Sequence, residues 1–182
     1  MNAHSLLTER AIFAAGCFWS KEYFFAQVPG VIATRVGYTG GHTAQPTYRQ
    51  VLTKTTGHAE AVEMTFDPAK VSFEALVKYF FEIHDATIDR TNKGGQYRSA
   101  IFYLDENQKA IAEKVMMELK SKHYNTVTNL EPAGIFWQAE DRHQKYCDTK
   151  GIKPKKYRVA ELNSQLPLLP APPTSAPLAT LA

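Results

Sequence analysis

Two kinds of pattern in the apolar residues alternate along the chain. Short apolar or alternating runs bounded by Gly or Pro are typical of strands, whereas apolar residues that recur every three or four positions are typical of helices. The short runs predict strands at 11–15, 31–38, 61–66, 100–104 and 127–130. The recurring pattern predicts helices at 17–26, 73–83 and 140–150, a long helix after residue 105, and one helical turn at 47–52.

Two of the predicted helices follow residues that favour a helix N-terminus. The side chains of Ser72 and Asp105 can each accept a hydrogen bond from a free backbone N–H of the first turn. The apolar positions that follow at helical spacing are Phe73, Leu76, Val77, Phe80 and Phe81 after the first cap, and Ile111, Val115, Met116 and Leu119 after the second. Each of these helices therefore has one apolar face to bury.

The predicted elements follow the order β-α-β-β-α-β, which is the ferredoxin-like split βαβ unit. A mixed sheet with helices on one face gives a two-layer α+β body. We expect a single domain over 1–163. From about residue 164 the composition shifts to Pro, Ala and Leu, so 164–182 is predicted to be an extended, disordered tail.

Composition narrows the class of protein further. Of the 182 residues, 44% are hydrophobic and 21% are charged, which is typical of a folded globular chain. The net charge of +3 is too small to argue for a nucleic-acid partner. No stretch is long and apolar enough to span a bilayer, and the N-terminus lacks the pattern of a secretory signal. We therefore expect a monomeric protein of the cytoplasm.

The two cysteines, Cys17 and Cys147, are too few for a disulfide scaffold. No C-x-x-C occurs, which argues against a thioredoxin-type motif and against a cysteine-based zinc site. In a reducing compartment both thiols stay free unless they take part in catalysis.

Cys17 stands where the first predicted strand passes into a helix, directly after Gly16. A thiol at that place lies near free backbone N–H groups and the positive end of the helix dipole, and both favour the reactive thiolate. The same position also suits a small core cysteine, because free cysteine is among the most buried residue types. Spacing alone does not decide between the two interpretations.

Three further polar residues stand in loops next to predicted strands. Tyr48 lies in a Gly-rich loop, Glu60 immediately precedes the third strand, and Tyr97 precedes the fourth. Loop residues held at strand ends are where binding and catalytic sites usually form. Taken one at a time, each is better explained as an ordinary polar residue of the surface.

Five short motifs follow one another along the chain: GCFW at 16–19, GYTGG at 37–41, PTY at 46–48, GHAEAV at 57–62 and QYRS at 96–99. Together they closely resemble the A-type peptide-methionine sulfoxide reductases (MsrA), which reduce the S epimer of methionine sulfoxide. The resemblance covers about 11–150. One GCFW is weakly specific, but five motifs in family order are highly specific. The resemblance implies an α+β fold with a ferredoxin-like core, in agreement with the pattern of elements.

The resemblance implies a role for each residue singled out above. Cys17 is implied to attack the sulfoxide sulfur, after which the substrate leaves as a thioether and the thiol becomes a sulfenic acid. Glu60 is implied to give a proton to the sulfoxide oxygen, which requires a carboxyl group kept neutral near pH 7 by burial beside aromatic groups. Tyr48 and Tyr97 are implied to donate their O–H groups to the same oxygen.

Phe18 and Trp19 follow the nucleophile, and the resemblance implies that they hold the methyl group of the substrate. An apolar box for one methyl group would reject the opposite epimer, because that epimer would place its oxygen in the box.

The chain departs from the family pattern at two places. Asn92 stands where the family usually has Asp, in a loop that is shortened over 86–95, so we expect a substrate contact there, with Asp89 as the alternative match. Many members also carry a second cysteine in a Gly-rich C-terminal tail, which is absent here. Cys147 is then either a resolving cysteine or a packed residue of the last helix. The resemblance implies no bound cofactor, and an external thiol of the thioredoxin or glutathione type as reductant.

Two other functions fit parts of the sequence. A cysteine hydrolase would use Cys17 with His58 and Asp89, and it needs a histidine within about 3 Å of the thiol. A non-enzymatic ferredoxin-like module would bind a metal or ligand through His143 and Cys147, whose i, i+4 spacing places them on one helix face. Two ligands without partners are a weak signal, so we expect no metal site.

Overall fold

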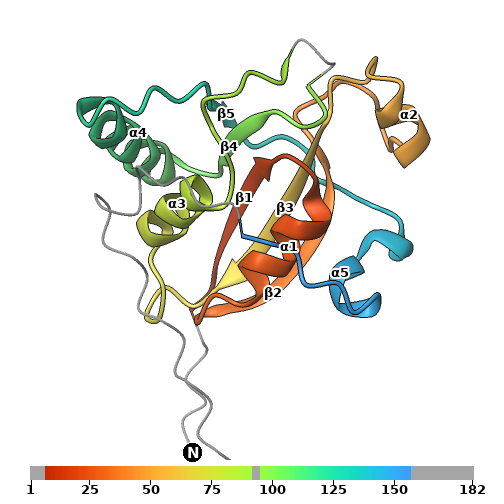
Figure 1. Cartoon of the computed structure of the whole chain (residues 1–182), viewed down its shortest axis with the longest axis horizontal. Helices are drawn as coiled ribbons and strands as arrows, with labels where there is room; N and C mark the ends of the chain where they lie inside the picture. The colour runs from red at the N-terminus through yellow and green to blue at the C-terminus, as the bar shows by residue number, and fades with distance from the viewer. Residues whose placement is uncertain (1–6, 92–94, 157–182) are drawn as a thin grey trace, which may run out of the picture.

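A mixed β-sheet with helices packed against it forms the described part of the chain, residues 7–91 and 95–156 of a computed structural model (Figure 1). The strands are β1 (Glu9–Ala15), β2 (Val31–Thr39), β3 (Ala59–Phe66), β4 (Ser99–Tyr103), β5 (Asn129–Pro132) and β6 (Trp137–Gln138). The helices are α1 (Phe18–Ala26), α2 (Tyr48–Leu52), α3 (Phe73–Glu82), α4 (Glu106–Ser121) and α5 (Tyr146–Thr149), with a 3-10 turn at Asp141–His143.

Strand β3 lies between β1 and β2 in the sheet, whose order is β5-β4-β1-β3-β2-β6. The two strands that α1 connects are thereby separated by a third strand. Strands β4 and β5 run parallel, and the other pairs are antiparallel. The predicted α+β class with a mixed sheet is confirmed.

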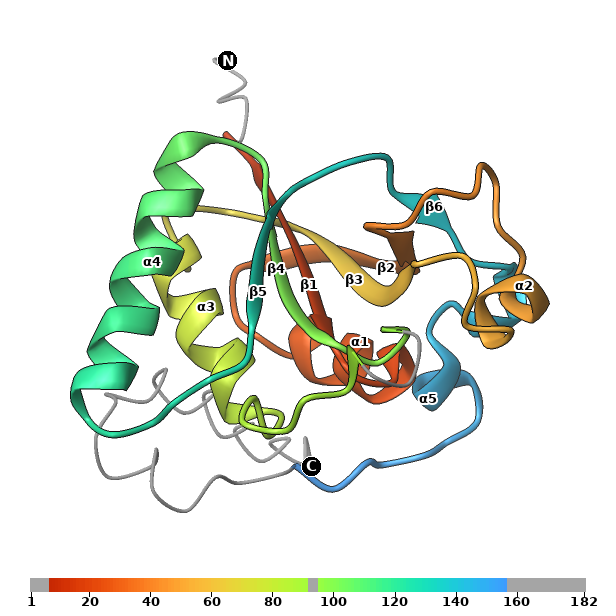
Figure 2. The same cartoon turned by 90° about the horizontal axis from the view of Figure 1, so that it is seen from above.

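Successive residues of β1 face two different layers, as expected of a strand. Phe13 packs into a large core that includes side chains of α1, α3 and α4. Ile12 and Ala14 point the other way, into a smaller core built mostly of alanines and closed by Ala133 and Phe136. Helices α1, α3 and α4 thus cover one face of the sheet, as predicted, and the connection from β5 to β6 crosses the other (Figure 2).

Both predicted helix caps are present. Ser72 accepts the backbone N–H of Ala75 at 3.1 Å at the start of α3, and Asp105 accepts that of Gln108 at 2.8 Å at the start of α4. These bonds satisfy donors that the first turn of a helix leaves free. Local sequence therefore determines where these two helices begin.

The single helix predicted at 140–150 is wrong. The chain forms a 3-10 turn and then the short α5, with Gln144 and Lys145 between them. Gln144 is extended, and its side-chain amide binds both backbone groups of Val36, at 2.9 Å and 3.0 Å. Lys145 follows with a left-handed φ of 51°, and its N–H donates to the buried Glu22 at 2.7 Å. Contacts with β2 and α1 therefore interrupt the helical pattern.

Strand β5 begins at Asn129, two residues later than predicted. The predicted tail at 164–182, and the end of the predicted domain at 163, lie outside the described residues. Within the described ranges, no helix has the length and apolar character needed to cross a membrane.

Candidate active site

Cys17 lies at the N-terminus of α1, directly after the turn that ends β1. The turn requires Gly16, whose φ of 90° is rarely adopted by residues with a side chain. Cys17 as a residue is exposed to solvent. Partial burial of its thiol nevertheless raises the pKa above the usual 9.0, and the charge of Glu60 raises it further. The backbone N–H groups of Trp19 and Ser20 lower the pKa by less. The helix terminus thus favours the thiolate, as expected, but burial and the charge of Glu60 outweigh it, so the net pKa of Cys17 is raised.

Glu60 in β3 is 1% exposed and is held by two hydrogen bonds. Its Oε2 accepts the backbone N–H of Phe18 at 3.1 Å, and its Oε1 accepts the side-chain amide of Gln96 at 2.8 Å. Burial raises the pKa of this carboxyl group to about 7, although both hydrogen bonds act in the opposite direction. Because Phe18 directly follows Cys17, an acid that is half protonated near pH 7 lies beside the thiol.

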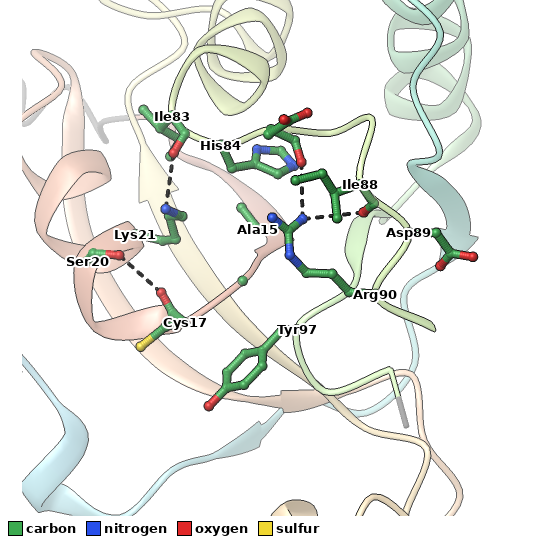
Figure 3. Close-up of a pocket in the computed structure, with 12 residues that line it drawn as sticks. Ala15, Cys17, Ser20, Lys21, Ile83, His84, Ile88, Asp89, Arg90 and Tyr97 are labelled. Carbon is green, nitrogen blue, oxygen red and sulfur yellow. Dashed lines mark hydrogen bonds between the residues drawn. The ribbon is translucent and has the colours of Figure 1, made fainter. Parts of the chain in front are cut away.

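Tyr48 and Tyr97 come from two different segments of the chain, a helix and a loop. Tyr48 is the first residue of α2, and Tyr97 lies just before β4. The Tyr48 side chain is near enough to raise the pKa of Tyr97. Burial, and then the charge of Glu60, raise the pKa of both phenols, so that each keeps its O–H group. The Tyr97 hydroxyl and the Cys17 sulfur point to the same side (Figure 3).

Phe18 and Trp19 form an aromatic wall next to the thiol. Phe18 is fully buried, with its ring centroid 5.9 Å from that of Tyr38 and 5.5 Å from that of His143. Trp19 stacks on Tyr146 with centroids 3.8 Å apart, and its Nε1–H donates to His143 Nδ1 at 3.1 Å. The wall is rigid because each ring is held by another.

Glu140 and His143 support the site, and the sequence did not point to either as part of it. Glu140 accepts the Tyr48 backbone N–H and the Tyr38 hydroxyl, both at 2.9 Å. His143 accepts the Trp19 N–H on Nδ1, which places its own proton on Nε2, and burial lowers its pKa. In the sequence these two residues belong to the polar run EDRHQ at 140–144. Its contacts with β2 and α1 form only on folding, so a local pattern does not predict them.

Two cavities, each of about 500 Å³, adjoin these residues. Cys17 and Tyr97 line the first, together with residues of α1 and of 83–90 (Figure 3). Trp19 and Tyr48 line the second, together with the 3-10 turn and α5. Cys17, Tyr48 and Tyr97 therefore border open space that a substrate can enter, whereas Glu60 lines neither of these two cavities.

Comparison with known families decides what this arrangement belongs to. The family model described as "Peptide methionine sulfoxide reductase" matches residues 9–167. The chain belongs to the peptide methionine sulfoxide reductase family. It is 50% identical over 150 residues to the peptide methionine sulfoxide reductase MsrA of Methanosarcina acetivorans, a match that covers 79% of this chain and 80% of that protein.

Solved structures of this family have the same fold. Methionine sulfoxide reductase A of Corynebacterium diphtheriae superposes with a TM-score of 0.70 at 33% identity, covering 85% of this chain and 80% of that one. Mxr1 from Saccharomyces cerevisiae in its reduced form gives a TM-score of 0.74 at 25% identity, covering 85% and 92%. Mxr1 in complex with Trx2 gives 0.57 at 20% identity, covering 87% and 94%, and adds a likeness of fold alone.

Cys147, the second cysteine of this family member, is buried in α5. Its S–H donates to the Trp19 carbonyl oxygen at 3.3 Å, which places it against the first turn of α1. Burial raises the pKa of Cys147, and the charges of Asp148 and Glu22 raise it further. Both cysteines are free thiols in this structure. Asn92 lies outside the described residues, so its substrate contact stays a prediction.

The residues of the two other functions do not assemble in this reductase fold. His58 is buried and its Nε2 bonds to the Thr43 carbonyl oxygen at 2.8 Å, so this nitrogen is not available as a base for Cys17. The carboxylate of Asp89 points away from the thiol (Figure 3). Over the part of the chain that the structure describes, no three His, Cys, Asp or Glu side chains gather as metal ligands.

Proposed function

We propose that this protein reduces the S epimer of methionine sulfoxide to methionine, with Cys17 as the nucleophile and Glu60 as the proton donor. The observation that carries the proposal is the buried Glu60, which is bound to the backbone of Phe18 and has a pKa of about 7. Membership of the family supports the reaction, and the geometry supports the roles of these residues. The proposal covers both free and protein-bound methionine sulfoxide.

The chemical step transfers one oxygen atom. Cys17 attacks the sulfoxide sulfur as a thiolate while Glu60 gives its proton to the sulfoxide oxygen. The sulfur–oxygen bond of the substrate breaks, the substrate leaves as a thioether, and the oxygen stays on Cys17 as a sulfenic acid. One thiol and one sulfoxide thus give one sulfenic acid and one thioether. The acid is needed because negative charge develops on the oxygen as its sulfur is attacked.

Tyr48 and Tyr97 stabilise the same oxygen. The raised pKa of each phenol keeps its proton in place as a donor. Donors that are already oriented toward developing charge lower the barrier without a cost of reorganisation. The influence of Tyr48 on the pKa of Tyr97 supports a shared position of the two phenols in front of the substrate oxygen.

Phe18 and Trp19 hold the methyl group of the substrate. Both rings are fixed by neighbours, Phe18 against Tyr38 and Trp19 against Tyr146. A rigid apolar wall favours a methyl group over an oxygen, because the oxygen would lose its hydrogen bonds there. This preference is the proposed source of selectivity for the S epimer.

External thiols supply the electrons, and no bound cofactor is required. One thiol forms a mixed disulfide with the Cys17 sulfenic acid and releases water, and a second thiol then frees Cys17. A thioredoxin-type dithiol provides both, as the complex of Mxr1 with Trx2 suggests by analogy. Cys147 is the internal candidate for the first thiol, because it lies against the first turn of α1.

The remaining sequence predictions are kept as part of this proposal. We propose a monomer with one catalytic domain over 1–163 that acts in the cytoplasm, where a reducing environment keeps both thiols free. Oxidised proteins and free methionine sulfoxide are its substrates, and neither nucleic acid nor membrane is a partner.

Turnover of the two separated epimers of methionine sulfoxide, with dithiothreitol as reductant, tests the function directly. We expect the S epimer to be reduced and the R epimer to remain. Comparable reduction of both, or of the R epimer alone, would contradict the assigned selectivity. Hydrolysis of an activated ester with no reduction of either epimer would favour the cysteine hydrolase instead.

A further inference from the structure

The cavity that contains Cys17 is larger than a site for one methyl group needs. It has a volume of about 500 Å³, and we call it the Cys17 cavity. Beyond Cys17 and Tyr97, its polar lining includes Lys21 of α1, and Arg90 of the loop after α3 (Figure 3). Two cationic side chains thus share a concave surface with the proposed nucleophile.

Neither cation is neutralised by the residues that the structure describes. Lys21 Nζ donates to the Ile83 carbonyl oxygen at 3.1 Å. Arg90 Nη1 donates to the carbonyl oxygens of Asp85 and Ile88, at 3.1 Å and 3.4 Å. All three acceptors are uncharged, and no ion pair between described residues includes either cation.

Two carboxylates, those of Asp85 and Asp89, also line the Cys17 cavity, and each is hydrogen-bonded to a threonine. Asp85 Oδ1 accepts the N–H and hydroxyl of Thr87, at 2.9 Å and 2.6 Å. Asp89 Oδ1 accepts the same two groups of Thr91, at 2.8 Å and 2.5 Å. Figure 3 shows the carboxylate of Asp89 pointing away from Lys21 and Arg90.

His84 also lines the Cys17 cavity and adds no charge at neutral pH. Burial lowers its pKa to about 3, and its two ring nitrogens are bonded to the Phe80 carbonyl oxygen and the Ser99 hydroxyl. The positively charged groups of this lining are therefore Lys21 and Arg90, and its negatively charged groups are Asp85 and Asp89. Burial lowers the pKa of Lys21, and the charge of Arg90 lowers it further, so the two cations repel each other.

Two like charges in a partly buried cavity are unfavourable until an anion joins them. A carboxylate has two oxygens, and charge-assisted hydrogen bonds to a guanidinium and an ammonium group are the strong kind. The apolar side chains of Ile83 and Ile88 in the same lining suit the methylene groups of a longer acidic side chain. The ligand that fits is therefore an aliphatic carboxylate.

We propose that the Cys17 cavity is a subsite for an acidic residue that neighbours methionine sulfoxide in a protein substrate, with Lys21 and Arg90 binding its carboxylate. This inference rests on the proposed function, because that function places the sulfoxide at Cys17. When the sulfoxide of a protein substrate lies at Cys17, the residues next to it in the substrate lie beside the rest of the Cys17 cavity. The subsite favours protein segments in which the oxidised methionine lies next to Glu or Asp.

Blocked peptides with one methionine sulfoxide flanked by Glu, Gln or Lys test the subsite. The flanking residue is placed before the sulfoxide in one set and after it in another, and dithiothreitol serves as an uncharged reductant. We expect the Glu peptide of at least one set to exceed its Gln counterpart in kcat/KM by about twofold to fivefold, the upper part of the range for exposed charge pairs. Added salt lowers this ratio.

Variants of the two cations locate the effect. Arg90→Gln and Lys21→Gln each lower the Glu-to-Gln ratio toward one, Arg90→Lys retains most of it, and Arg90→Glu shifts the preference to the Lys peptide. The charge of Lys21 also acts on Cys17, so a Lys21 variant can change the rate of the chemical step. Such a change affects the Glu and Gln peptides equally and cancels in the ratio of their kcat/KM values.

Three outcomes would overturn the subsite. One is equal kcat/KM for Glu and Gln peptides in both sets, and another is a preference that survives Arg90→Gln and Lys21→Gln. The third is a higher kcat/KM for N-acetylmethionine sulfoxide than for its amide, together with equal kcat/KM for the Glu and Gln peptides. The cavity would then bind the main-chain carboxylate of free methionine sulfoxide. Failure of the proposed function looks different, because no peptide of any set would be reduced.

Discussion

The Glu60 carboxylate accepts the backbone N–H of Phe18 at 3.1 Å, and this bond ties the proposed acid to the residue that follows the proposed nucleophile. It joins the start of β3 to the first turn of α1. Both elements are fixed by the core, so the separation of acid and thiol does not depend on a loop. The same burial that fixes Glu60 also raises its pKa.

Cys17→Ser removes the attacking sulfur, and we expect reduction of methionine sulfoxide to fall below detection. The position is at the surface end of α1, so the fold is retained and circular dichroism stays unchanged. The matched variant is Cys147→Ser, which keeps the Cys17 sulfur and its first turnover. Substantial turnover by Cys17→Ser would remove that residue from the mechanism.

Glu60→Gln keeps the shape of the side chain and removes its proton. We expect kcat/KM to fall by about 10²–10⁴-fold, the scale of general-acid catalysis. In the wild type, the active form needs a neutral Glu60 and a Cys17 thiolate together. Because the pKa of Glu60 is about 7 and that of Cys17 is above 9.0, the amount of this form rises with pH up to about 7 and then levels off.

In Glu60→Gln, the levelling near pH 7 should disappear, and the rate should go on rising until the thiol itself is ionised. Stopped assays of kcat/KM between pH 5 and 9 measure both profiles. An unchanged profile in the variant would assign the ionisation near pH 7 to another group.

The raised pKa of Glu60 also makes the fold sensitive to pH. Folding favours the protonated form, so this contribution to stability is complete below the usual pKa of 4.5 and is lost as the pH rises through about 7. The difference corresponds to about 3 kcal/mol. We expect Glu60→Gln to gain stability relative to the wild type between pH 5 and pH 8, as measured by urea unfolding.

The control for that measurement is Glu113→Gln, which makes the same change of side chain at an exposed position on α4. Parallel stability curves for Glu60→Gln and the wild type would show that Glu60 has an ordinary pKa.

Tyr48→Phe and Tyr97→Phe each remove one donor to the sulfoxide oxygen and leave the ring. We expect each to lower kcat on the order of 10²-fold, with a smaller effect on KM, because the bond strengthens as charge develops. The matched control is Tyr23→Phe, which changes a ring on α1 away from both cavities. Wild-type kcat in both active-site variants would exclude the donor role.

A thiol count after one turnover without reductant tests the role of Cys147. If it resolves the sulfenic acid, two thiols per chain disappear and a Cys17–Cys147 disulfide forms. This removes the S–H that Cys147 donates to the Trp19 carbonyl oxygen. Loss of one thiol, with a sulfenic acid that dimedone traps, would leave Cys147 as a packing residue. The Cys147→Ser variant gives the reference value for the second case.

Local sequence was enough for those parts of the fold that depend on near neighbours. The strands of the split unit, and the caps Ser72 and Asp105, were predicted because alternation and capping involve residues a few positions apart. The five motifs likewise pointed to Cys17 and Glu60, since family motifs are themselves local strings. The prediction of one helix at 140–150 was wrong because a distant contact interrupts it. Gln144 is bound to the backbone of Val36, more than a hundred residues away in the sequence.

The sequence by itself determined the family and the order of the elements up to β5, and its motifs pointed to the proposed reacting groups. Only the tertiary structure decided the pKa values of these groups and the residues that hold them in place. A pKa depends on burial and on charges that folding brings near. Folding raised the pKa of Glu60, as expected, and at Cys17 burial outweighed the pKa-lowering effect of the helix terminus. It also brought Glu140 to Tyr48, and Arg90 into the cavity of Lys21, through contacts between segments that no local pattern connects.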